Sequence, residues 1–130
     1  MKHLLASVIL FTLFSAYAFT QDKSSNSVVT IAICTSVGNR QPVGTDSVFS
    51  SNVGKLYCFT KLKGQAEESV ISHVWIFEGK EMAKIDLKMK ANMFRTWSAK
   101  TILPEWKGSW SVEVRDADGN KLRSISFKVQ

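Results

Sequence analysis

Histidine is scarce in this sequence of 130 residues, which contains only His3 and His73. We expect His3 to be removed with an N-terminal signal, so His73 would have to serve any Ser-His-Asp or Cys-His site. No G-x-S-x-G elbow presents a serine nucleophile, and a closely spaced set of three or four zinc ligands is missing. We therefore predict a protein that is not an enzyme and that needs no metal or other cofactor.

Cysteine is equally scarce. Cys34 and Cys58 lie in the strand-like stretches "TIAICTS" and "KLYCFTKL", and the absence of a C-x-x-C motif gives no support to redox catalysis. In an oxidising compartment an even number of cysteines favours a disulfide, so we predict a Cys34–Cys58 bond. Two buried free thiols are the alternative.

Apolar runs long enough to span a membrane are also lacking. The start "MKHLLASVILFTLFSAYA" has a short basic end, an apolar run and small residues before Ala18, which is the pattern of a cleavable signal peptide; an uncleaved anchor is the alternative. We predict a signal peptide at 1–18, a flexible tether at 19–27 and a single domain at 28–130. The mature form would be exported, periplasmic or else extracellular, and would not span the membrane.

Helical periodicity is absent, whereas alternation of polar and apolar residues recurs along the chain. The strand-like stretches are "VVTIAICTS", "KLYCFTKL", "SVISHVWIF", "AKIDLKMK", "FRTWSAKTI", "SWSVEVRD" and "LRSISFKV". Residues 37–54 resemble a long loop, with one short edge strand near Val48 and Phe49, and "DADGN" is typical of a hairpin turn. These features predict an all-β fold, an immunoglobulin-like antiparallel β-sandwich of about seven strands, with a small closed β-barrel as the alternative.

"DADGNK" also begins like a calcium loop, but it fails at two of the positions that such loops require. Lys121 stands at the sixth place instead of Gly, and Phe127 stands at the twelfth instead of Glu. A turn followed by a glycine bulge explains the stretch better.

Several motifs resemble an uncharacterised bacterial family, the domain of unknown function numbered 2914. They are "NRQPVG", the "HVW" strand, "RTWSAK" and "WKGSWSVEV", and the resemblance spans roughly Ile31 to Val129. The usual family pattern is "NREPV", so Gln41 replaces an acidic residue here. The resemblance implies a small β domain on the outer side of a bacterial inner membrane, without a known activity.

Basic and aromatic residues are the main candidates for a ligand site. If neighbouring strands place His73, Trp75, Arg95 and Trp97 on one face, they form a ladder that could bind a sugar ring or a planar anion. The alternative, which we favour, puts Trp75, Trp97 and Trp110 in the core, with Arg95 as a buried, hydrogen-bonded brace and His73 as a structural residue. The full candidate set is Arg40, His73, Trp75, Arg95, Trp97, Lys100, Trp106 and Lys107, and the loop "LPEWK" is the better place for contact.

The charge balance is basic, with 17 Lys and Arg against 11 Asp and Glu. Export would remove nucleic acid as a partner, and the envelope polyanions that remain are lipid head groups, glycans and cell-wall carboxylates. We therefore predict a non-catalytic binding module for an anionic or carbohydrate-containing envelope component. The alternative is an accessory or inhibitor subunit that docks on an envelope protein.

Overall fold

The computed structural model describes residues 27–64 and 69–130. The strands are β1 (Ser27–Cys34), β2 (Ser36–Gly38), β3 (Gln41–Val43), β4 (Val48–Phe49), β5 (Lys55–Lys63), β6 (Val70–Phe77), β7 (Lys80–Lys88), β8 (Met93–Thr101), β9 (Gly108–Arg115) and β10 (Lys121–Val129). The predicted signal peptide, and the predicted tether except for Ser27, lie outside the described residues. Within the described ranges, no helix has the length and apolar character of a membrane span.

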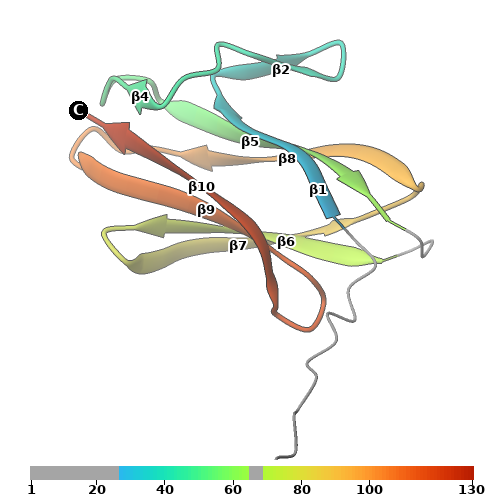
Figure 1. The fold of residues 1–130 in the computed structure, drawn as a ribbon. Helices are drawn as coiled ribbons and strands as arrows, with labels where there is room; N and C mark the ends of the chain where they lie inside the picture. The colour runs from blue at the N-terminus through green and yellow to red at the C-terminus, as the bar shows by residue number, and fades with distance from the viewer. Residues whose placement is uncertain (1–26, 65–68) are drawn as a thin grey trace, which may run out of the picture.

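The seven long strands form two sheets that pack face to face (Figure 1). One sheet has the order β1-β5-β8, and the other has the order β4-β10-β9-β6-β7, in which the short β4 pairs parallel with β10. Among the seven long strands, the chain crosses between the sheets after β5, β7 and β8, as in immunoglobulin-like sandwiches. The predicted sandwich is confirmed. No sheet built from the described residues closes into a barrel.

The core lies between the two sheets and follows the alternation within each strand. In β6, Ile71, His73 and Trp75 are fully buried on the face that meets the three-stranded sheet. In β9, Trp110 and Val112 are buried on the same face, opposite Phe77 and Trp75 in the register. Each large apolar side chain buried here contributes roughly 2–3 kcal/mol to folding. The prediction that Trp75 and Trp110 belong to the core is confirmed.

Cys34 and Cys58 are both buried, and both are free thiols. The register of β1 and β5 pairs Cys34 with Tyr57 and Ile33 with Cys58. Because successive side chains of a strand point to opposite faces, the two sulfur atoms leave the sheet in opposite directions, which a disulfide cannot bridge. The structure thus corrects the predicted disulfide to the alternative of two buried thiols.

Part of the segment expected to be a loop forms a second, smaller hairpin. Strands β2 and β3 are joined by Asn39 and Arg40, whose φ angles are 51° and 58°. Two successive positive φ values define a type I′ turn, which prefers Gly at its second position. Here Arg40 occupies that position, so the usual sequence signal for a hairpin is missing. The hairpin contacts β1 and β5 and extends beside the three-stranded sheet (Figure 1).

The β9–β10 connection is the hairpin turn predicted from "DADGN". The buried carboxylate of Asp116 accepts backbone N–H bonds from Asp118 at 3.0 Å and from Asn120 at 2.8 Å, and Gly119 takes a φ of 86°. The Asp116 carboxylate thus stabilises the turn by bonds to the backbone of the turn itself.

The part of the chain that the structure describes contains no group of three His, Cys, Asp or Glu side chains able to hold a metal ion.

Candidate functional site

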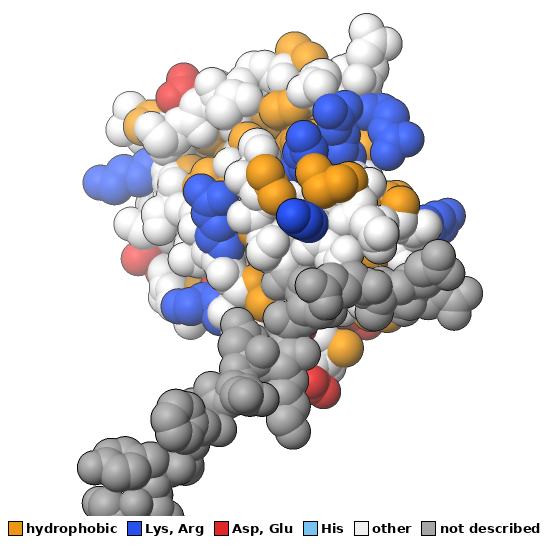
Figure 2. Space-filling model, turned by 45° about the vertical axis from the view of Figure 1, so that its right-hand side comes forward, with side chains coloured by type: hydrophobic (Ala, Val, Ile, Leu, Met, Phe, Trp, Pro, Cys, Tyr) orange, Lys and Arg blue, Asp and Glu red, His pale blue; other side chains and the backbone are white. Residues whose placement is uncertain are grey.

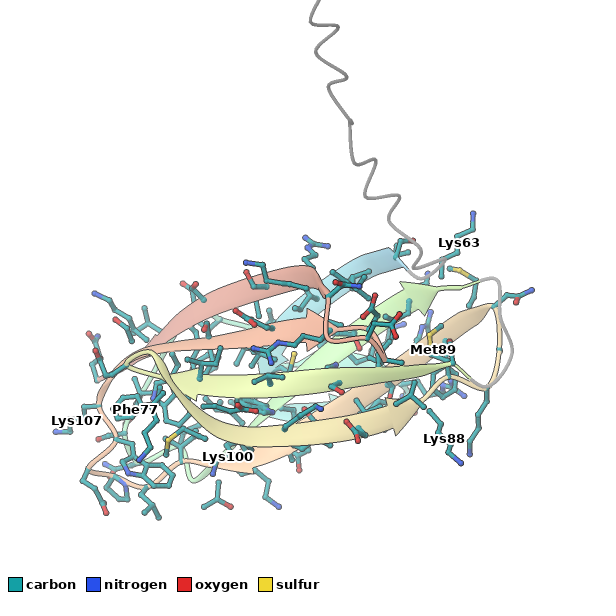
Figure 3. All side chains as sticks on the ribbon, turned by 90° about the horizontal axis from the view of Figure 1, so that it is seen from below. Lys63, Phe77, Lys88, Met89, Lys100 and Lys107 are labelled. Carbon is teal, nitrogen blue, oxygen red and sulfur yellow. The ribbon has the colours of Figure 1, made fainter. Side chains whose placement is uncertain are left out.

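The eight candidate residues fall into three separate places. His73 and Trp75 lie in the core, and both are fully buried. Lys100 and Lys107 lie at one end of the sandwich, near Phe77 and far from Lys63 and Lys88 (Figure 3), and Trp106 lies close to Lys100. The remaining three, Arg40, Arg95 and Trp97, lie together on the outer face of the three-stranded sheet.

His73 is the centre of a buried polar network between the sheets. Its Nδ1 lies 2.7 Å from Ser98 Oγ, which also accepts a bond of 3.0 Å from the indole N–H of Trp75. Its Nε2 lies 3.1 Å from Thr60 Oγ1, and that hydroxyl donates to the carbonyl of Thr96 at 3.3 Å. All four bonds are made when His73 is neutral with its proton on Nε2, because Ser98 then donates to Nδ1.

The network makes His73 structural. Burial lowers the pKa of His73 to about 4, because the charged imidazolium loses its hydration in the interior. The side chain is sealed from solvent and both of its ring nitrogens are occupied. His73 and Trp75 are therefore closed to a ligand. They face the inner side of the three-stranded sheet, whereas Arg95 and Trp97 lie on its outer side, so the four residues do not form the proposed ladder.

In the β8–β9 loop, predicted as the contact region, Trp106 packs against the core, while Leu103 to Glu105 are exposed. Trp106 is half-buried, its ring lies 6.1 Å from that of Trp110, and its carbonyl accepts the indole N–H of Trp110 at 3.0 Å. The ammonium group of Lys100 lies 4.9 Å from the centre of the Trp106 ring, within the range of a cation–π contact. Lys107 is exposed. The Lys100 ammonium group and the Trp106 ring thus contact each other, so this face of the ring is not open to a ligand.

Four cations gather on the outer face of the three-stranded sheet. Lys61 on β5 lies directly opposite Arg95 on β8 in the register. Two adjoining hollows of about 310 and 390 Å³ share Arg40, Phe94 and Arg95; Lys61 lines the first and Lys90 the second. We call Arg40, Lys61, Lys90 and Arg95 the basic surface. The space-filling view shows Lys and Arg side chains beside exposed hydrophobic ones on one face of the molecule (Figure 2).

The basic surface is electrostatically unbalanced. No described acidic side chain lines either hollow. Among residues 27–64 and 69–130, the ion pair found joins Arg115 to Glu113 on the other sheet. Like charges directly opposite each other on neighbouring strands oppose folding. The arrangement of Lys61 and Arg95 therefore favours an anion that lies between or above them.

Trp97 lies beside the basic surface instead of in the core. Its side chain is 38% exposed, and its ring stacks at 6.4 Å and 15° on that of Phe59, which is 2% exposed. Arg95, on the same face, is half-buried and donates no hydrogen bond to a described residue. The predictions of Trp97 as core and of Arg95 as a buried brace are wrong, because the inward face of β8 carries Thr96 and Ser98 for the His73 network.

The sequence did not single out every residue of this site. Phe59 and Lys61 share one face of "KLYCFTKL", and alternation places them together. The sequence did not show whether that face points inward or outward, because both faces of β5 are partly apolar. Lys90 follows β7 in an exposed position, where only the tertiary structure brings it next to Arg95.

A larger hollow, of about 580 Å³, lies on the outer face of the five-stranded sheet. Four serines line it, together with Lys128 and Glu78. Glu78 accepts the backbone N–H of Ser109 at 2.6 Å, so its carboxylate is held by the chain itself. This hollow has one cation and one carboxylate, and it lacks the concentration of like charge that marks the basic surface.

Comparison with known proteins finds a family model that matches part of the chain. Residues 68–129 match the family model described as protein of unknown function (DUF2914). The resemblance to this family is confirmed over that segment. The DUF2914 segment contains β6 to β10, and with them Lys90, Arg95 and Trp97, whereas Arg40 and Lys61 precede it. No curated protein matches the chain.

Two of the solved structures that match are distantly similar to this chain. One is a mutant β-glucosidase from Listeria innocua in complex with laminaribiose, with 10% identity and a TM-score of 0.44 over 83% of this chain and 16% of that chain. Another is a Niemann-Pick type C2 protein from the Japanese carpenter ant, with 13% identity and a TM-score of 0.41 over 88% of this chain and 100% of that chain. This chain thus spans about a sixth of the length of the glucosidase chain.

Proposed function

We propose that this protein is a non-catalytic binding module that recognises an anionic ligand through the basic surface. The observation that supports this proposal is the placement of Lys61 directly opposite Arg95. Arg40 lines both hollows beside them, Lys90 lines the second, and no described carboxylate lines either. A cluster of like charges raises the local concentration of counter-ions and accelerates encounter with an anionic partner. If the chain is exported as its first residues suggest, the partner is an anionic component of the cell envelope.

The backbone of Arg40 gives a second, independent support. A residue with a side chain in the left-handed region costs of order 1 kcal/mol, and such strain is often found at functional sites. Arg40 has a φ of 58° at a turn position where Gly is preferred. The turn keeps a strained arginine that lines both hollows of the basic surface.

The proposal is tested by binding of two anions, inorganic tripolyphosphate and a trimer of galacturonic acid, which have in common only that they are negatively charged. Calorimetry at low and moderate salt should show binding that weakens as salt screens the charges. The double variant Lys61→Gln, Arg95→Gln should lose most of the affinity. The matched control Lys84→Gln, Lys88→Gln removes two exposed lysines from β7 and should bind like the unmodified protein.

Two results would overturn the proposal. One is the absence of binding to both anions at low salt. The other is an equal loss of affinity in the test and control double variants, because this would mean that net charge alone attracts the anions.

One edge of β8 pairs with no other strand among the described residues, and this favours a second candidate, docking on an acidic partner protein. β8 is nine residues long and is the edge strand of the three-stranded sheet. One side of β8 pairs with β5, and the other side faces away from the sheet. An extended segment of a partner can add to such an edge, and acidic side chains on it would reach the basic surface. Crosslinking from position Ala99 in cells, followed by identification of the attached species, distinguishes a protein partner from an envelope polysaccharide or lipid.

A further inference from the structure

Trp97 differs from the other tryptophans of the chain in its exposure. Trp75 and Trp110 are at most 2% exposed and Trp106 is half-buried, whereas Trp97 is 38% exposed. Large aromatic side chains contribute most to stability when they are buried, whereas part of this indole lies open beside the basic surface, where a ligand can reach it. The indole and the basic surface meet in one hollow, whose lining includes Arg40, Lys90, Arg95 and Trp97.

The ring of Trp97 is also held in a fixed orientation. Phe59 lies opposite Trp97 in the β5–β8 register, and their rings stack at an interplanar angle of 15°. Phe59 is almost fully buried, so it forms a rigid backing for the indole. A side chain that is already ordered loses little conformational entropy when a ligand binds.

Arg95 and Trp97 are two residues apart on one strand, so their side chains leave the sheet on the same face, about 7 Å apart. The guanidinium group presents a planar fork of donors that matches a carboxylate or a phosphate. The indole presents a flat apolar plate. Together they fit a ligand that has an apolar ring face and an acidic group attached to it.

We infer that the surface binds an acidic sugar, whose ring stacks on Trp97 and whose carboxylate or phosphate group lies on Arg95, with Arg40 and Lys90 around it. Lys61 lines the adjoining hollow, which shares Arg40 and Arg95 with the first, so a second acidic unit of the same chain can lie there. This assignment rests on the proposed function, since it specifies the ligand of the same basic surface.

Titration of the Trp97→Ala, Trp97→Phe and Arg95→Gln variants with the galacturonic acid trimer and with tripolyphosphate tests the assignment. Trp97→Ala should weaken binding of the trimer roughly fivefold to tenfold and leave the affinity for tripolyphosphate unchanged. Trp97→Phe, which keeps a ring, should retain most of the affinity for the trimer. Arg95→Gln should weaken binding of both anions. The neutral methyl ester of the trimer should bind far more weakly than the acid.

The outcomes separate this assignment from the proposed function. If Trp97→Ala changes neither affinity or lowers both equally, the stacking assignment is overturned while anion binding stands. If a single-stranded oligonucleotide of equal charge binds more tightly than the trimer, the ligand is a nucleic acid and the sugar assignment fails. If the unmodified protein binds neither anion, the proposed function and this assignment fail together.

Discussion

Lys61 and Arg95 lie directly opposite each other in the antiparallel register of β5 and β8, and both project from the outer face of the three-stranded sheet. Two facing cations repel each other, and no described carboxylate in the lining of the two hollows offsets the repulsion. Stability and the proposed anion binding therefore make opposite demands on this pair, and substitutions should move them in opposite directions.

Replacement of Lys61 by Glu should stabilise the protein and weaken anion binding. The change converts a repulsive cross-strand pair into an attractive one, so the free energy of unfolding should rise by roughly 0.5–1 kcal/mol. Urea denaturation measures the stability, and calorimetry with tripolyphosphate measures the binding. Lys84→Glu on β7 is the control with the same change of charge. A Lys61→Glu variant that binds tripolyphosphate like the unmodified protein would contradict the site.

Replacement of Arg40 by Gly should have a similar double effect through the backbone. Gly adopts the positive φ of this turn without a steric penalty, and the resulting Asn-Gly pair is the preferred type I′ sequence. We expect the free energy of unfolding to rise by about 0.5 kcal/mol and the affinity for tripolyphosphate to fall. Arg40→Lys, which keeps the charge and the strain, should leave stability unchanged. A loss of stability in Arg40→Gly would show that the arginine side chain supports the hairpin.

Removal of the Ser98 hydroxyl should be strongly destabilising. Ser98→Ala takes away the partner of His73 Nδ1 and of the Trp75 indole N–H at once, and buried polar groups without partners cost about 1–3 kcal/mol each. We expect the free energy of unfolding to fall by roughly 2–4 kcal/mol. Ser124→Ala, at an exposed position of β10, should stay within about 0.5 kcal/mol of the unmodified protein. Equal effects of the two changes would contradict the network.

The buried imidazole should make stability fall at mildly acidic pH. Burial lowers the pKa of His73 from 6.5 to about 4 in the folded protein, so between these values the unfolded chain binds a proton that the folded protein does not. His73 therefore does not lower the free energy of unfolding above pH 6.5. As the pH falls from 6.5 toward 4, it lowers the free energy of unfolding by up to roughly 3 kcal/mol. Denaturation curves at several pH values measure the slope. An NMR titration of the His73 ring in the folded protein with a midpoint near 6.5 would contradict this expectation.

Both thiols should be protected in the folded protein. Cys34 and Cys58 are buried on opposite faces of the sheet, and burial raises the pKa of each thiol, which keeps it in the less reactive protonated form. We expect slow reaction with a thiol reagent under native conditions and two reactive thiols after denaturation without a reductant. Only disulfide-bonded protein after denaturation would contradict the free thiols.

Much of the fold could be predicted from the sequence, because alternation is a local property. The seven long strands, the edge strand at Val48–Phe49 and the turn of "DADGN" all appear where the pattern placed them. The β2–β3 hairpin could not be predicted in the same way, because Arg40 replaces the Gly that usually marks such a turn. The DUF2914 resemblance was also present in the motifs, and it is confirmed for residues 68–129.

By itself, the sequence determined which residues alternate and therefore which ones share a face of a strand. Only the tertiary structure decided which face of β8 meets the other sheet. The buried His73 needs hydroxyl partners, and Ser98 and the backbone-bound Thr60 supply them from the three-stranded sheet. Burial of an unpaired imidazole would cost more than exposure of part of an indole. That balance turns Thr96 and Ser98 inward and leaves Arg95 and Trp97 on the outer face, where a ligand can reach them.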